Sequence, residues 1–152
     1  MKREIKFRAW DKKRKSMFVP DSFVFDENTG EIMSVWRKGT DGETIGGLDP
    51  RKVRLILMQS TGFHDKNGQS IYDGDIVRVQ ETMDNGRIVC LEAVSTVVWN
   101  GQLGCWCCHG EFDGNLADYA AGTMLNAMGN ICEVIGNIFE DKQLMEGKYE
   151  QK

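Results

Sequence analysis

Six dipeptides that favour tight turns constrain this chain more than any other feature of its sequence. Each joins an asparagine or an aspartate to a glycine, and they are Asp41-Gly42, Asn67-Gly68, Asp73-Gly74, Asn85-Gly86, Asn100-Gly101 and Asp113-Gly114. Such pairs adopt the left-handed backbone of β-hairpin turns at little steric cost. Short β-branched or aromatic runs lie between them, so the sequence predicts a mainly β (α+β) fold.

The N-terminal segment has the period-two pattern of a half-buried strand. Residues 5, 7 and 9 are apolar and share one face, while Lys6, Arg8 and Trp10 share the other. Residues 16–19 can return along this strand after a turn at residues 11–15. We therefore expect an N-terminal β-hairpin arm whose first, alternating strand lies at a sheet edge, with Trp10 on its exposed face.

The 152 residues are enough for one domain with its own core. Four glycines in residues 39–47 indicate a subdomain boundary. We predict a single domain over residues 1–152, with a β arm over 1–48, a small SH3-like barrel-type core over 49–142 and a polar tail over 143–152. Helical spacing predicts a short helix over 116–128, and a capping aspartate predicts a second over 141–146.

Charge is distributed unevenly along the chain. Residues 1–15 carry eight basic and two acidic side chains, a local charge of +6, which leaves −10 for the rest of a chain whose total is −4. This asymmetry has two interpretations, a solvated hairpin or an interaction arm. As an arm it would bind nucleic acid through Lys6, Arg8, Trp10, Lys12, Lys13, Arg14 and Lys15, although the acidic remainder repels a polyanion.

The sequence favours the cytoplasm and gives no sign of a membrane partner. Its longest uninterrupted aliphatic stretch spans residues 55–58, far short of the roughly 18 apolar residues of a membrane span. The basic N-terminus is followed by an alternating pattern, whereas a secretory signal would continue with an apolar run. Because the five cysteines are odd in number and not spread in pairs, we expect reduced thiols.

A cluster of cysteines and a histidine invites comparison with metal and catalytic sites. It contains Cys105, Cys107, Cys108 and His109. On a strand, Cys105 and Cys107 are the only two thiols of this cluster that share a face, so a zinc site would need Cys90 or Cys132 to come near. Neighbouring strand residues point oppositely, which separates Cys108 from His109 as nucleophile and base. We expect ordinary strand residues here, with no catalytic residue, metal or cofactor.

Three aspartates, Asp65, Asp73 and Asp75, also cluster in sequence. Their spacing lacks the ligand positions of a calcium loop, and the glycines form no phosphate-binding loop. Aspartate beside a turn glycine commonly hydrogen-bonds the local backbone. We therefore interpret these residues as turn formers.

Three segments carry a more specific pattern, and they span residues 3–11 (REIKFRAWD), 57–77 (including LMQSTG, DKNG and IYDGDIV) and 133–140 (EVIGNIFE). In these motifs and their order the chain resembles the YopX family of phage and prophage proteins. The resemblance implies a small, mainly β, self-associating phage-encoded protein, and it implies no catalytic residues. The chain departs from the family pattern at Ser60 and at Phe63-His64.

These observations lead to one expectation and one alternative. We expect a non-enzymatic phage or prophage accessory protein in the host cytoplasm, acting by self-assembly as a homo-oligomer or by binding a host or phage protein. The alternative is nucleic-acid binding through the basic N-terminal hairpin.

Overall fold

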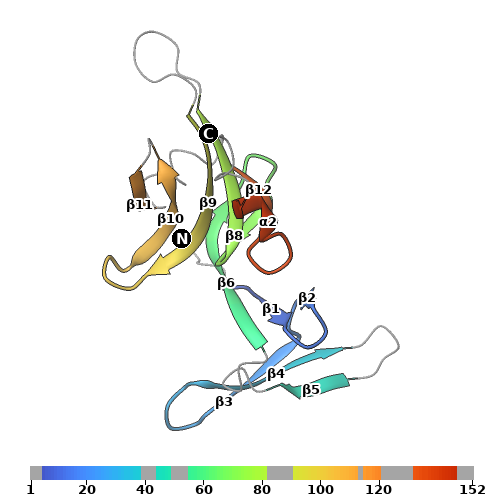
Figure 1. Ribbon diagram of the computed structural model, residues 1–152. Coiled ribbons are helices and arrows are strands. Elements are labelled where there is room, and N and C mark those ends of the chain that lie inside the picture. The colour runs from blue at the N-terminus through green and yellow to red at the C-terminus, as the bar shows by residue number, and fades with distance from the viewer. Residues whose placement is uncertain are drawn as a thin grey trace. The chain divides into compact units, whose positions relative to one another are not determined.

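The computed structural model describes residues 5–38, 44–48, 55–81, 91–112, 115–120 and 132–146 (Figure 1). It confirms a mainly β protein. Its elements are β1 (Phe7–Asp11), β2 (Ser16–Phe18), β3 (Ser22–Phe25), β4 (Ile32–Lys38), β5 (Thr44–Leu48), β6 (Leu55–His64), β7 (Ser70–Tyr72), β8 (Asp75–Glu81), β9 (Leu91–Asn100), β10 (Cys105–Phe112), β11 (Asn115–Ala120), β12 (Cys132–Asn137) and α2 (Gln143–Glu146). Among the described residues, no helix has the length and apolarity needed to cross a membrane.

The chain forms two compact units that divide inside β6. One contains residues 5–59, and the other contains the described residues from 60 onward. Each unit has its own apolar cluster. The single domain with a boundary near residue 48 stays a prediction.

In the first unit, β1 lies between β2 and the first half of β6, and both pairings are antiparallel. A second antiparallel sheet has the order β3-β4-β5. A core cluster joins residues from both sheets, with Phe23, Ile32 and Leu57 packed against Ala9, Phe18, Val35 and Leu55. Apolar residues at alternate positions of β1 and β6 thus form one buried face.

In the second unit, a five-stranded antiparallel sheet with the order β11-β10-β9-β8-β12 forms a half-barrel (Figure 1). The second half of β6 pairs with β7. The core cluster contains Ile71, Val77, Val97, Trp106, Cys108 and Cys132. The two cysteines thus pack as small apolar side chains.

The turn dipeptides predicted the connections well. Five of the six lie between consecutive strands that pair antiparallel, namely β4–β5, β6–β7, β8–β9, β9–β10 and β10–β11. The exception is Asp73-Gly74, where the chain turns from β7 into β8, a strand of the five-stranded sheet. Gly74 has a φ of +76°, which a side chain would disfavour. The dipeptides at residues 41–42, 85–86 and 113–114 lie outside the described residues.

The prediction of a helix over residues 116–128 is wrong where the structure describes it. Residues 116–120 belong to β11, which pairs with β10 from Cys107↔Ala120 to Phe112↔Asn115. Tertiary pairing with a neighbouring strand outweighs a weak helical pattern, and only two residues, Asp113-Gly114, separate the strands. Residues 121–128 lie outside the described residues. Within the range 141–146 the structure has the four-residue helix α2.

Candidate functional site

The basic hairpin at residues 7–18 is the candidate site that the structure builds most clearly. Its turn is organised by Asp11, whose side chain is 1% exposed. One carboxylate oxygen, Oδ1, accepts the backbone N–H of Lys13 at 2.9 Å and that of Arg14 at 3.2 Å. Lys15 completes the turn with a φ of +50°. The short aspartate side chain thus supplies an acceptor for backbone N–H groups of the turn.

The four residues of this turn are all basic, and we call them the basic tip: Lys12, Lys13, Arg14 and Lys15. Their side chains are exposed. Within the residues that the structure describes, none of the four forms an ion pair. The basic tip therefore presents concentrated positive charge to solvent on a backbone fixed by a buried carboxylate. Such a group of cations attracts anionic surfaces.

The other three predicted binding residues differ from the basic tip in their exposure or in their contacts. Lys6 is exposed and Arg8 is partly buried, and both interact with other groups of the protein. Trp10 is only 8% exposed, and its cross-strand neighbours are Met17 and Ile56. The prediction that Trp10 lies on an exposed face is therefore wrong, and this indole cannot stack on a base.

The expected edge position of the N-terminal strand is also wrong. β1 pairs with β6 along its whole length and with β2 over Ala9 to Asp11, so it is not an edge strand. Three successive side chains, Ala9, Trp10 and Asp11, are buried. The alternating pattern predicted the strand correctly, but it carries no information about what covers the second face or the second edge.

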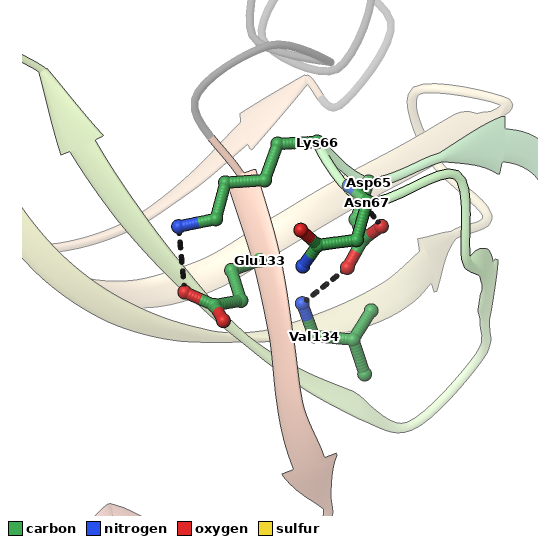
Figure 2. A network of polar contacts seen from close by, with 5 residues as sticks. All are labelled: Asp65, Lys66, Asn67, Glu133 and Val134. Atoms are coloured by element: carbon green, nitrogen blue, oxygen red, sulfur yellow. Dashed lines mark hydrogen bonds and ion pairs between the residues drawn. The ribbon is translucent and has the colours of Figure 1, made fainter.

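Asp65 forms a second aspartate-centred turn, shown in Figure 2. Its side chain is buried, and Oδ1 accepts the backbone N–H groups of Asn67 at 2.8 Å and Gln69 at 2.9 Å. The other oxygen, Oδ2, accepts the N–H of Val134 in β12 at 3.1 Å. Its predicted role as a turn former is confirmed, and the bond to β12 adds a link across the unit.

Two further contacts support the same link. The backbone N–H of Lys66 donates to the carbonyl oxygen of Cys132 at 2.9 Å, and Lys66 Nζ lies 2.7 Å from Glu133 Oε2 (Figure 2). Burial alone would raise the pKa of Asp65, but hydrogen bonds from the backbone of residues 69, 134 and 67 outweigh it and lower that pKa. The hydrogen bonds that link Asp65 to its turn and to β12 therefore favour the charged form of its carboxylate.

The other two aspartates also serve the turn between β7 and β8. Asp75 is fully buried, and its Oδ2 accepts the N–H of Tyr72 at 2.7 Å. Burial raises the pKa of Asp73, partly offset by a hydrogen bond from the backbone of Gly74. Gly74 in turn donates to the carbonyl of Val97 at 2.8 Å. The turn-former interpretation is confirmed for this pair.

The cysteines divide between the two faces of β10, as the strand period predicts. Cys105 Sγ and Cys107 Sγ lie 3.9 Å apart, whereas Cys108 packs with Cys132 in the core cluster. Burial raises the pKa of Cys108 to about 11, with a smaller contribution from Cys107. Burial also raises the pKa of Cys132 to about 12, with smaller contributions from Cys108 and nearby carboxylates. These two thiols stay protonated at neutral pH and are poor nucleophiles.

His109 and His64 are both exposed. In the described part of the chain, no three side chains of the His, Cys, Asp and Glu types gather where they could hold a metal ion. Cys90 lies outside the described residues.

Sequence reasoning missed two features of the surface. It did not identify Asp11 as the residue that organises the basic tip, although an aspartate directly before a basic turn is a usable signal. It also missed Trp99, which is 51% exposed and meets Trp106 edge to face at 5.2 Å between ring centroids. Nothing in the local sequence distinguishes an exposed strand tryptophan from a buried one.

Comparison with known proteins identifies relatives of this architecture. A family model described as YopX protein matches residues 6–146. Among curated proteins, none matches the chain. Among solved structures, the chain is similar to the crystal structure of protein EF1440 from Enterococcus faecalis, with a TM-score of 0.55 and 22% identity over 95% of this chain and 99% of that one. At that identity the likeness concerns the fold alone.

Proposed function

The chain belongs to the YopX protein family, and from that premise we propose that it is a non-enzymatic phage or prophage accessory protein that binds a macromolecular partner in the host cytoplasm. The observation that carries this proposal is the basic tip. Four exposed cations on a turn held by buried Asp11 form a preorganised contact point for an anionic surface.

The use of the reactive residue types supports binding over catalysis. The carboxylates of Asp65 and Asp75 accept backbone N–H groups, and the thiols of Cys108 and Cys132 fill the core. A catalytic group must instead face a substrate with a matched pKa. In the described residues, these side chains are committed to the fold.

The partner we favour is an acidic protein surface, and nucleic acid is the alternative. A phosphate backbone offers the same regular negative charge to the basic tip. Because Trp10 is buried, any nucleic-acid contact at the hairpin rests on phosphates and does not depend on base sequence.

The test measures binding of the whole chain to polyglutamate and to single- and double-stranded DNA by fluorescence anisotropy, at low and high salt. Four phosphate contacts would weaken DNA binding by roughly 10²-fold between 50 and 200 mM salt. The variant K12Q/K13Q should lose most of this binding. The matched control K66Q/K142Q removes two cations elsewhere and should leave binding unchanged.

The outcomes separate the two partners. Binding of polyglutamate but not DNA, lost in K12Q/K13Q, supports an acidic protein partner, while DNA binding lost in the same variant supports the alternative. If neither polyanion binds, or if the control variant loses as much as K12Q/K13Q, the basic tip is not a binding site.

Self-assembly is proposed as a second mode of action, and one observation favours it. β3 lies at the end of the described order β3-β4-β5, and its Val24 and Phe25 are 46% and 57% exposed. An edge strand with exposed apolar side chains can pair with a second copy. Light scattering after size-exclusion chromatography should give a homo-oligomer that V24K/F25E converts to monomer. A monomeric parent protein contradicts this mode.

We also propose a finer description of the fold, in which the half-barrel of the second unit is SH3-like. The tight corner between β7 and β8 at Asp73-Gly74 supports it, because small barrels fold over at such corners. A crystal structure whose strands superpose poorly on SH3-like barrels would contradict this description.

A further inference from the structure

Two thiols lie in contact on the face of the five-stranded sheet opposite the core cluster. Cys105 Sγ and Cys107 Sγ are 3.9 Å apart. They alternate along β10 with Trp106 and Cys108, both members of the core cluster. Since residues i and i+2 of a strand share a face, Cys105 and Cys107 form a dithiol outside the core cluster, although Cys107 itself is buried.

The dithiol has one accessible and one enclosed member. Cys105 begins β10 after the turn at residues 101–104 and is partly exposed, while Cys107 has no exposed surface. Cys107 Sγ also lies 3.9 Å from the carbonyl oxygen of Cys105. An ion from solvent can therefore reach the pair through Cys105 and find the second sulfur already beside it.

The backbone holds this spacing before any ion arrives. Cys105 is in register with Asn100 and Cys107 with Val98, so both lie on a paired strand of the sheet. Sites on regular strands hold their ligands more accurately than sites on loops. The dithiol is preorganised, and an ion binding there pays little to order its ligands.

The sulfur separation fits a single bridging ion. Metal–thiolate bonds are about 2.3 Å long, and an ion at that distance from both sulfurs would have an S–metal–S angle of roughly 115°, close to trigonal. Among the first-row metals, thiolates favour soft ions such as Cu(I). Zinc is a poorer match because a structural zinc site takes four protein ligands, and the described residues gather no group of three.

We propose that Cys105 and Cys107 bind one soft, thiophilic metal ion of the Cu(I) class, with a third ligand from solvent. Binding breaks two S–H bonds, forms two S–Cu bonds and releases two protons. Copper enters and stays as Cu(I), so the step consumes neither oxidant nor reductant. The proposal is independent of the basic tip, which lies in the other compact unit.

The experiment titrates Cu(I) into the whole chain under anaerobic conditions, in competition with a chromophoric Cu(I) chelator. Cys90 is replaced by serine throughout, because that thiol lies outside the described residues. We expect one Cu(I) per chain. Two linked ligands gain roughly 10²–10⁴ in affinity over one, so C105S should weaken binding by about 100-fold or more.

Two comparisons make the result decisive. C108A removes a thiol one residue away on the opposite face and should leave Cu(I) affinity unchanged, with circular dichroism reporting that each variant is folded. C107S should match C105S. Equal affinity in C105S and the parent, equal losses in C105S and C108A, or Zn(II) bound as tightly as Cu(I) would each overturn the proposal.

Discussion

Two turns in this protein are each organised by a buried aspartate that accepts backbone N–H groups, and they differ in the contacts around the turn. In the hairpin of the first unit, Asp11 accepts two backbone N–H groups from within its own turn. In the second unit, Asp65 does the same and also accepts the N–H of Val134, 69 residues further along the chain. Both aspartates close a turn, and Asp65 also fastens its turn to a distant strand.

The charges around these turns differ in the same way. Lys66, beside Asp65, is engaged by Glu133, whereas the four cations of the basic tip remain in solvent. A similar aspartate-centred turn therefore serves the fold at one site and displays charge at the other. The comparison teaches that the function of such a turn depends on whether nearby side chains of opposite charge pair with its cations.

The largest expected effect is from Asp65→Ala. It removes the acceptor for three backbone N–H groups, and charged hydrogen bonds are worth about 1.5–3 kcal/mol each without adding fully. We expect the free energy of unfolding to fall by about 3 kcal/mol or more in urea denaturation. The control Lys66→Ala removes a partly exposed ion pair and should cost at most about 1 kcal/mol. Equal losses in the two variants would mean that the Asp65 hydrogen bonds stabilise the fold no more than the Lys66–Glu133 ion pair does.

A smaller loss is expected from Asp11→Ala. Two backbone N–H groups of the turn lose their acceptor, so the free energy of unfolding should fall by about 2 kcal/mol. Because the turn then loosens, affinity of the basic tip for a polyanion should fall as well, although no cation is removed. A D11A loss larger than that of D65A in the same urea series would reverse the comparison.

The carboxylate of Asp65 also leads to a prediction about stability in acid. The folded-state pKa of Asp65 is lowered from its ordinary value of 3.8, so the folded state binds fewer protons than the unfolded state as the pH approaches that value. The stabilisation is present above about pH 5 and is lost as the pH falls through the folded-state pKa. Thermal unfolding between pH 6 and pH 3 should show a shallower decline in Asp65→Asn than in the parent. Parallel curves would indicate that protonation of Asp65 does not contribute to the loss of stability in acid.

The smallest effect on stability is expected at the basic tip. Neutralising all four residues in K12Q/K13Q/R14Q/K15Q removes exposed charges that form no ion pairs in the described structure. The free energy of unfolding should change by less than about 0.5 kcal/mol, because substitutions at exposed positions rarely do more. A large loss in urea denaturation would mean that the basic tip serves the fold as the Asp65 turn does.

Local sequence signals predicted the connections of this fold better than its surfaces. Asparagine-glycine and aspartate-glycine pairs act through their own backbone preferences, so five of six correctly separate paired strands. The same reasoning placed Cys105 and Cys107 on one face of β10. It failed at residues 116–120, where a helical spacing of apolar residues lies in a strand paired with β10.

By itself, the sequence determined where the chain turns, which residues alternate along each strand and where positive charge concentrates. These properties depend on neighbours within a few residues. Only the tertiary structure decided that β1 is a central strand, that Trp10 is buried and that Asp65 reaches Val134. Strand order and burial arise from contacts between residues far apart in the chain, and no local pattern encodes which partner a strand will meet.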